Sequence, residues 1–212
     1  MSGLVVLEGR WQNNRNVSVK SLFDLLVDME FNNIHNYHYE NFTNVQSFRA
    51  ILNNIFLPNA HKRYLYIGGH GDEINVNGTV DNVSRTEIRN SLHEIQGGQL
   101  RGFFVGACLF GNEENAGFFF APEIGVVPTI RWFAGYQGNV DWIKSSVMDI
   151  IFWQRIFSER IRHPGATENT IIENVCNYLN HSVSGLMEEL EFQVYRRRPQ
   201  HPNEPERLIG SQ

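Results

Sequence analysis

Short apolar runs alternate along the chain with stretches whose apolar residues recur every three or four positions. The apolar runs predict strands over residues 3–9, 63–69, 100–108 and 128–136, and the first of these is expected to be buried. An alternating aromatic stretch predicts a further strand over 36–42, and residues 190–198 predict a late strand. The stretches at helical spacing predict helices over about 18–30, 43–56, 84–95, 142–159 and 168–180, with a short helical piece around Leu186. His163-Pro164-Gly165 breaks the chain between the last two long helices.

Residues with capping chemistry stand at the start of four predicted helices. They are Ser18, Asp141 and the capping boxes Thr43/Gln46 and Ser84/Glu87. We expect Gly97-Gly98 to end the third helix and Asn77-Gly78 to form a two-residue hairpin turn. Met29 continues the helical spacing of apolar residues in the first helix, and Val147, Ile150, Ile151 and Phe157 of the fourth are predicted to face the core.

This alternation of strands and helices predicts an α/β fold. Crossover connections give a mainly parallel central sheet with helices on both faces, that is, three layers. The 190–198 strand is expected at an edge of the sheet, and the organisation is a single domain over 1–198 with a polar C-terminal tail over 199–212. Ligands of such sheets bind outside the carboxyl ends of the strands, so residues there become the candidates for function.

Composition narrows the function classes. The 212 residues are 42% hydrophobic and 19% charged, which suits one domain with a full core. A net charge of −5 argues against nucleic-acid binding, and the basic cluster over 196–198 is interpreted as a solvated strand end. Because neither a secretory leader nor an apolar run of about 18–20 residues is found, we expect a soluble, cytoplasmic protein without a membrane partner.

Two ionisable residues stand where neighbouring strands end. His70 follows the 63–69 strand in "YLYIGGHGDE", and Cys108 ends the 100–108 strand. If these strands are adjacent, about 4.8 Å apart, both side chains reach one substrate carbonyl. An imidazole can take the proton of a thiol and so activate it as a nucleophile. The N–H groups of Gly71 and Cys108 then form a candidate oxyanion hole.

The remaining cysteine and histidines have simpler interpretations. Cys176 shares a helical face with Ile171, Ile172, Val175 and Leu179, so we expect it in the core. The other histidines are interpreted as surface or packing residues. With two cysteines and no C-x-x-C spacing, neither a disulfide framework nor a cysteine metal site is expected.

The strand ending in "GGHGD", the hairpin and helix after it, and the strand ending in "GAC" resemble the caspase-like cysteine peptidases. This group spans caspases, metacaspases, gingipains and CHAT domains, and the likeness covers about residues 4–160, including "GYQGNVDW" over 135–142. It is closest to CHAT-like and other small bacterial members. The resemblance implies a caspase-like three-layer sandwich, a His70–Cys108 catalytic dyad and an oxyanion N–H from Gly71.

The resemblance also implies a function. It is that of a cysteine endopeptidase that needs no metal or organic cofactor and cuts a protein substrate encoded nearby. Such an enzyme is an effector in bacterial defence, including antiviral defence, or in programmed cell death. The chain departs from animal caspases in two ways. "GACLFG" replaces their Q-A-C-x-G, and no linker between large and small subunits is visible. Neither aspartate specificity nor activation by cleavage is therefore implied.

Two other function classes stay open. One is a catalytically inactive interaction module that kept the fold, although retention of both His70 and Cys108 weighs against it. The other is a small-ligand-binding α/β domain, which the lack of a G-x-G-x-x-G or G-x-x-x-x-G-K-[ST] phosphate loop disfavours. Selective, pH-dependent alkylation of Cys108 over Cys176 would favour the enzyme over the module.

Two residues are candidates for the substrate pocket. Tyr136 ends the fifth strand and is expected either to wall the pocket or to pack at the strand end. Asp141 is expected either to hold a basic side chain at P1, the residue before the cleaved bond, or to cap the helix that begins at Trp142. The first role of Asp141 predicts Arg or Lys at P1, and the second predicts a medium apolar residue such as Leu.

Overall fold

The computed structural model describes residues 3–11, 17–30, 36–56, 61–95, 100–122, 129–198, 200–201 and 204–209. Its strands are β1 (Gly3–Glu8), β2 (Tyr37–Asn41), β3 (Lys62–Gly68), β4 (Asn75–Asn77), β5 (Asn82–Ser84), β6 (Gly102–Gly106), β7 (Trp132–Tyr136), β8 (Phe192–Arg196) and β9 (Glu206–Ile209). Its helices are α1 (Lys20–Glu30), α2 (Val45–Phe56), α3 (Arg85–Glu94), α4 (Glu113–Phe120), α5 (Trp142–Arg162), α6 (Glu168–Ser182) and α7 (Ser184–Glu189).

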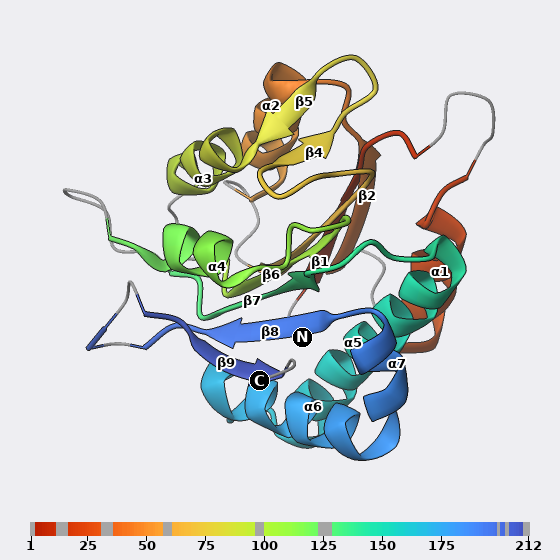
Figure 1. Cartoon of the computed structure of the whole chain (residues 1–212), viewed down its shortest axis with the longest axis vertical. Helices are drawn as coiled ribbons and strands as arrows, with labels where there is room; N and C mark the ends of the chain where they lie inside the picture. The colour runs from red at the N-terminus through yellow and green to blue at the C-terminus, as the bar shows by residue number, and fades with distance from the viewer. Residues whose placement is uncertain are drawn as a thin grey trace.

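Seven strands form the central sheet, in the order β2-β1-β3-β6-β7-β8-β9. The first five in this order pair in parallel, whereas β8 runs antiparallel to β7 and β9 antiparallel to β8. Helices α2, α3 and α4 cover one face, and α1, α5, α6 and α7 cover the other (Figure 1). The predicted α/β architecture with a mainly parallel sheet and helices on both faces is confirmed.

Alternation along β1 shows how the sequence supplies two cores. Leu4 and Val6 face the helices α1 and α5, whereas Val5 and Leu7 face α2 and α3. A strand buried on both faces reads as a continuous apolar run, and this is why β1, β3, β6 and β7 were recognisable in the sequence. The expected core position of Cys176 is also confirmed, because this thiol is only 3% exposed.

The C-terminal segment differs from the sequence expectation. Residues 206–209, predicted within a polar tail, form β9, which pairs with β8 and buries Ile209. Arg196 of β8 forms an ion pair with Glu206 of β9 at 2.8 Å. The expectation that β8 is an edge strand is therefore wrong, because β9 lies beyond it. Strand β9 was not predicted because its four residues of alternating charged and apolar character are too short a pattern to recognise.

Two local turns also differ from their predictions. Helix α2 begins after Asn44, whose side chain accepts from the Ser47 N–H at 3.0 Å, so the predicted Thr43/Gln46 box is displaced by one residue. The β4–β5 hairpin closes with Asn77 opposite Asn82, which leaves four residues in its loop where two were predicted. The Ser84/Glu87 capping box is confirmed. Gly97-Gly98 lies outside the described residues.

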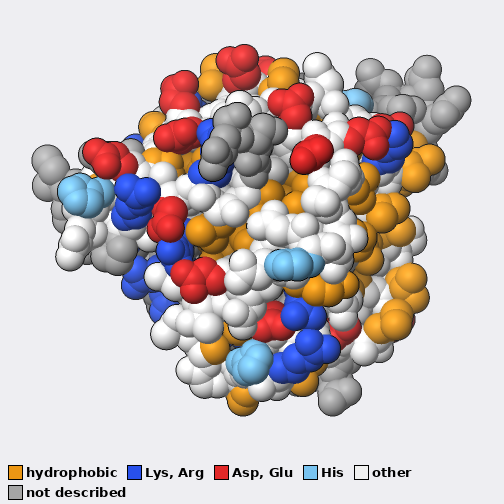
Figure 2. Space-filling model, turned by 60° about the horizontal axis from the view of Figure 1, so that its bottom comes forward, with side chains coloured by type: hydrophobic (Ala, Val, Ile, Leu, Met, Phe, Trp, Pro, Cys, Tyr) orange, Lys and Arg blue, Asp and Glu red, His pale blue; other side chains and the backbone are white. Residues whose placement is uncertain are grey.

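Helices α1 and α5 leave apolar residues on the surface. Met29 is 76% exposed and Val147 is 48% exposed, so the prediction that Val147 faces the core is wrong. With Leu25 and Ile143 they line a groove of about 510 Å³ between the two helices. Figure 2 shows hydrophobic side chains gathered on the side of the molecule where these helices lie. The helical period identified an apolar stripe but could not say how much of it another element covers.

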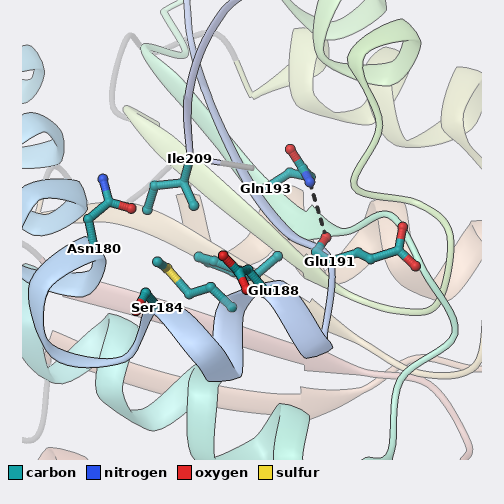
Figure 3. Close-up of a pocket in the computed structure, with 8 residues that line it drawn as sticks. Asn180, Ser184, Glu188, Glu191, Gln193 and Ile209 are labelled. Carbon is teal, nitrogen blue, oxygen red and sulfur yellow. Dashed lines mark hydrogen bonds between the residues drawn. The ribbon is translucent and has the colours of Figure 1, made fainter. Parts of the chain in front are cut away.

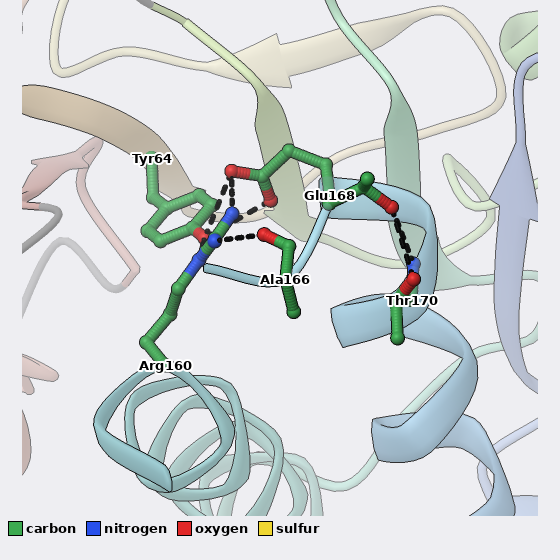
Figure 4. Close-up of polar contacts among 6 residues, drawn as sticks. Tyr64, Arg160, Ala166, Glu168 and Thr170 are labelled. Atoms are coloured by element: carbon green, nitrogen blue, oxygen red, sulfur yellow. Dashed lines mark hydrogen bonds and ion pairs between the residues drawn. The ribbon is translucent and has the colours of Figure 1, made fainter. Parts of the chain in front are cut away.

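A buried ion pair fixes α5 and α6 to the sheet. The Arg160 guanidinium pairs with Glu168, donates to the Tyr64 hydroxyl at 2.9 Å and donates to the Ala166 carbonyl at 3.0 Å (Figure 4). Tyr64 belongs to β3 and in turn donates to the Glu168 carboxylate at 3.1 Å. Each charge therefore has a partner, which a buried ion needs.

Candidate active site

Strands β3 and β6 end at the same level of the sheet. They pair in parallel with Gly68 opposite Gly106, so the predicted adjacency is confirmed. His70 lies two residues beyond Gly68, and Cys108 lies two residues beyond Gly106. The equal offset places both residues just outside the carboxyl edge, where ligands of parallel sheets bind.

A tyrosine lies beneath this edge. A Cβ at Gly68 would stand 2.7 Å from a ring carbon of Tyr66, so only glycine leaves room for that ring. The Tyr66 hydroxyl donates to Asp149 of α5 at 2.6 Å, and the Tyr136 hydroxyl donates to the same carboxyl at 2.6 Å. Burial raises the pKa of Asp149 to about 7, although the two hydrogen bonds act in the opposite direction.

His70 is exposed at the start of the β3–β4 connection. Its carbonyl oxygen accepts from the Asn77 N–H at 2.7 Å, which ties the loop to the hairpin. Its imidazole lies against the indole of Trp11, with ring centroids 5.9 Å apart and planes at 68°. No described residue forms a hydrogen bond with the imidazole, so within the described part of the chain neither ring nitrogen is engaged.

Gly71 has the backbone features that an oxyanion donor requires. It forms an antiparallel β-bridge with Val76. The two hydrogen bonds of this bridge run from the Asn77 N–H to the His70 carbonyl and from the Asp72 N–H to the Asn75 carbonyl, so the Gly71 N–H takes no part. No described residue accepts from the N–H of Gly71 or of Cys108. A Cβ at Gly71 would stand 2.8 Å from the Ala107 Cβ, so glycine permits this loop to approach the cysteine loop closely.

Cys108 is half-buried between two loops. Its Sγ accepts from the Val140 N–H at 3.5 Å, and the next residue, Leu109, donates its N–H to the Gly138 carbonyl at 3.1 Å. Leu109 has a φ of 63°, an uncommon conformation for a residue with a side chain. Such strain is found mostly at functional sites, and here it belongs to the sharp turn that presents the thiol. His70 and Cys108 are not hydrogen-bonded to each other.

Asn115 of α4 joins the two candidate loops. Its buried amide donates to the Glu73 carbonyl at 2.7 Å and to the Phe110 carbonyl at 2.8 Å. Its amide oxygen accepts from the Arg85 guanidinium at 2.9 Å. One side chain thus connects the loop after His70 with the loop after Cys108.

The structure places the two residues predicted for the substrate pocket in different surroundings, one buried and one exposed. Tyr136 is fully buried, and its hydroxyl oxygen also lies 2.9 Å from the Ser145 carbonyl oxygen, so it contacts α5 and cannot touch a peptide. This placement is the strand-end packing that was its alternative. Asp141 is exposed and caps α5, accepting from the N–H groups of Ile143 and Lys144 at 3.0 Å.

Glu191 brings another carboxylate to the same loop. A Cβ at Gly138 would stand 2.5 Å from its Oε1, and its carbonyl accepts from the Gln137 N–H at 3.0 Å. Glu191 has a φ of 46° and is exposed, and no described basic residue pairs with it. It also borders a pocket of about 190 Å³ that is lined by Asn180, Ser184, Met187, Glu188, Phe192, Gln193 and Ile209 (Figure 3).

That pocket is lined by one hydroxyl, that of Ser184, but by neither a thiol nor an imidazole. Within the described ranges, no group of three or more His, Cys, Asp or Glu side chains is arranged to hold a metal ion. None of the described helices combines the length and apolar character that crossing a membrane requires. The His70–Cys108 edge is therefore the candidate site that carries reactive groups.

Comparison with solved structures assigns the fold class: the chain has a caspase-like fold. Iotapain, a secreted C11 cysteine protease from Bacteroides thetaiotaomicron, matches with a TM-score of 0.52 and 10% identity, over 95% of this chain and 67% of that chain. Caspase-1 from Spodoptera frugiperda matches with a TM-score of 0.51 and 10% identity, over 85% of this chain and 77% of that chain.

A further structure is a secreted C11 cysteine protease from the same Bacteroides species in complex with an irreversible peptide inhibitor. It has a TM-score of 0.49 and 9% identity, and the match covers 92% of this chain and 66% of that one, slightly less than two thirds. No protein-family model and no curated protein matches the sequence. At identities near 10% the likeness establishes the fold and no finer subgroup.

Sequence reasoning missed several residues of this site. Trp11, Asn115 and Glu191 contact it from elements distant in the chain, and Glu8 reaches it indirectly through Trp11. Only Glu8 gave a signal, since a carboxylate at the end of an apolar strand is unusual in a segment expected to be buried. The others depend on tertiary contacts that no local pattern records.

Proposed function

We propose that this protein is a cysteine endopeptidase in which His70 and Cys108 act as a dyad. The observation that carries the proposal is the Gly68–Gly106 register, which gives the imidazole and the thiol the same offset from adjacent strand ends. The caspase-like fold supports it, because the structural neighbours with this fold are cysteine proteases. The free N–H groups of Gly71 and Cys108 add the hydrogen-bond donors that acyl transfer needs.

In the first half of the reaction, the His70 imidazole takes the proton of the Cys108 thiol. The thiolate then attacks the carbonyl carbon of the peptide bond, and the N–H groups of Gly71 and Cys108 stabilise the oxyanion. As the carbon–nitrogen bond breaks, the imidazolium returns its proton to the leaving amine. The product is a thioester between the substrate carbonyl and Sγ.

In the second half, water replaces the amine. His70 takes a proton from this water, and the resulting hydroxide attacks the thioester carbonyl. The carbon–sulfur bond breaks and releases the carboxylic acid, and the Cys108 thiolate regains its proton from the imidazolium. Protons and electrons balance without any metal or organic cofactor.

The substrate is proposed to lie in a groove at the carboxyl edge of the sheet, bordered by the loop after Cys108 and by residues 137–141. Asp141 is committed to the N-terminus of α5, where it already accepts two N–H groups. The Asp141 carboxylate is therefore not offered to a basic P1 side chain. We accordingly propose a medium apolar P1 residue such as Leu.

We extend the proposal to the role of the enzyme. The resemblance to small bacterial CHAT-like members favours an effector in defence or programmed cell death that acts in the cytoplasm on a protein encoded nearby. The competing function is a catalytically inactive interaction module with the same fold. Two observations argue against the module. The Cys108 thiol is only half-buried, with its Sγ held by the Val140 N–H, and the His70 imidazole is exposed with no hydrogen bond to a described residue.

The deciding experiment compares new protein N-termini in host lysate treated with wild type, Cys108→Ala, His70→Ala or Cys176→Ser protein. We expect wild type and Cys176→Ser to generate the same new N-termini, and both other variants to generate none. The two losses should not add, because each partner is useless without the other. Cleavage by Cys108→Ala would overturn the mechanism, and identical lysates in all four arms would favour the interaction module.

A further inference from the structure

Glu8, the last residue of β1, is a buried carboxylate that accepts hydrogen bonds from four neutral donors. It is 1% exposed. One oxygen accepts from the Trp11 indole N–H and from the Val19 N–H at 2.8 Å. The other accepts from the Ser18 hydroxyl at 2.6 Å and from the Tyr39 hydroxyl. Burial and the bond to Glu8 raise the pKa of Tyr39 to about 12, so this hydroxyl remains a donor at neutral pH.

A buried carboxylate in such a setting is costly to keep. Removing an ion from water carries a penalty of several kcal/mol, which neutral donors only partly offset, and an apolar residue of similar size usually stabilises a fold better. Stability alone therefore does not account for Glu8. What distinguishes its four donors is that one of them, the Trp11 indole, contacts the candidate catalytic histidine.

The Trp11 indole is fixed on two sides. Its N–H is held by Glu8, and its six-membered ring lies over Gly68, where a Cβ would stand 3.2 Å from an indole carbon. The β1–β3 pairing places Glu8 directly opposite Gly68. One residue of this pair therefore binds the indole N–H, and the other, lacking a side chain, leaves room for the indole ring. The ring then meets the His70 imidazole edge to face, an arrangement that aromatic pairs prefer.

We propose that Trp11, oriented by the buried Glu8 carboxylate, is the positioning residue for the His70 imidazole. The imidazole has no described hydrogen-bond partner, so the indole is the described side chain that restrains its orientation. Without that restraint the exposed imidazole would sample several rotamers, and only a fraction would direct a ring nitrogen toward Cys108. This inference rests on the proposed peptidase function.

The test separates the ring from its N–H group. Trp11→Ala removes both, whereas Trp11→Phe keeps an aromatic ring beside His70 but loses the bond to Glu8. We expect Trp11→Ala to lower kcat by about 10- to 100-fold with KM changed less than about twofold, because a misplaced catalytic group slows chemistry without weakening substrate binding. Trp11→Phe should recover part of kcat. Tyr178→Ala, which removes an exposed aromatic that contacts Arg155 on α5, is the matched control and should leave kcat unchanged.

A second readout does not depend on activity. In Cys108→Ala protein, nuclear Overhauser effects between the rings of Trp11 and His70 should be strong, and Glu8→Gln should move the Trp11 indole proton resonance upfield as its charged acceptor is lost. Unchanged kcat in folded Trp11→Ala, or absence of the ring-to-ring effects, would overturn the positioning role. If the effects are present but wild type shows no cysteine-dependent cleavage, the peptidase proposal fails and the ring arrangement stands as a structural contact only.

Discussion

The Asn115 amide donates a hydrogen bond of 2.7 Å to the Glu73 carbonyl, although 42 residues separate them in the chain. The same nitrogen donates to the Phe110 carbonyl, two residues after Cys108. The loops that carry His70 and Cys108 are therefore held in register by one buried side chain. A helix-borne residue is better suited to this than a loop residue, because α4 itself is fixed against the core.

We predict that Asn115→Ala lowers kcat/KM by at least tenfold and the free energy of unfolding by about 1–3 kcal/mol, since the Glu73 carbonyl and the buried Phe110 carbonyl lose their donor. Urea denaturation and peptidase assays on the same preparation measure both quantities. The control is Asn174→Ala, which loses one hydrogen bond to Glu159 far from the site and should affect stability only. Equal kcat/KM for wild type and Asn115→Ala would show that the two loops keep their register without it.

The two thiols should differ sharply toward alkylating reagents. Cys108 is half-buried at the sheet edge, whereas Cys176 is 3% exposed and its burial raises the pKa of its thiol well above the usual range. We expect iodoacetamide to modify Cys108 selectively in the native protein, with a rate that depends on pH and falls in His70→Ala. Peptide mapping by mass spectrometry gives the site. Labelling of both cysteines at one slow rate would argue for the interaction module.

Asp149 should make stability fall as pH rises. Its pKa is about 7 in the folded protein and ordinarily 3.8, so the folded state binds its proton more tightly than the unfolded state does. The contribution of Asp149 to the free energy of unfolding is therefore fully present below about pH 4 and is lost as the pH rises through about 7. At about 1.4 kcal/mol per pKa unit, the loss is on the order of 4 kcal/mol. Urea midpoints of wild type and Asp149→Asn between pH 4 and 8 check this.

The variant should lack this decline, because its amide does not ionise. A difference between wild type and variant that stays constant from pH 4 to 8 would mean that Asp149 is ionised throughout. Since Asp149 holds Tyr66, which lies beneath the ends of β3 and β6, a matching loss of activity near pH 7 would indicate that the network also supports the site.

Substrate choice should follow from the cap formed by Asp141. With that carboxylate engaged by α5, a fluorogenic library scanned at P1 should show preference for Leu and other medium apolar residues. Asp141→Asn keeps a capping side chain and should leave the preference unchanged. Preference for Arg or Lys that disappears in Glu191→Gln would contradict the apolar prediction and assign the charge of the pocket to Glu191, whose carboxylate lies against Gly138.

The strands and their ends could be predicted because their signals are local. Buried parallel strands read as apolar runs, and the positions of His70 and Cys108 at two of these ends followed from strand order alone. Helix α4 was missed, since its Glu113–Phe120 segment begins with two acids and ends in three consecutive phenylalanines, which gives no clear helical period.

The pocket residues could not be predicted for a different reason. Tyr136 and its neighbour Gln137 stand one residue apart, yet the pleat buries the first against α5 and exposes the second. A shift of one residue thus decides between core and surface, and a strand end gives too short a pattern to fix it. The contacts of Trp11 and Asn115 depend on chain segments that the sequence does not place relative to one another.

The position of β9 has a practical consequence for recombinant work. A version of the protein cut at residue 198, where the domain seemed to end, would leave β8 with a row of unpaired backbone groups and would uncover Val194 and Tyr195. Such an open, apolar edge is a template on which a second chain can add a strand, and chains joined in this way go on to form insoluble assemblies. The four residues of β9 therefore protect the edge of β8 against intermolecular strand exchange.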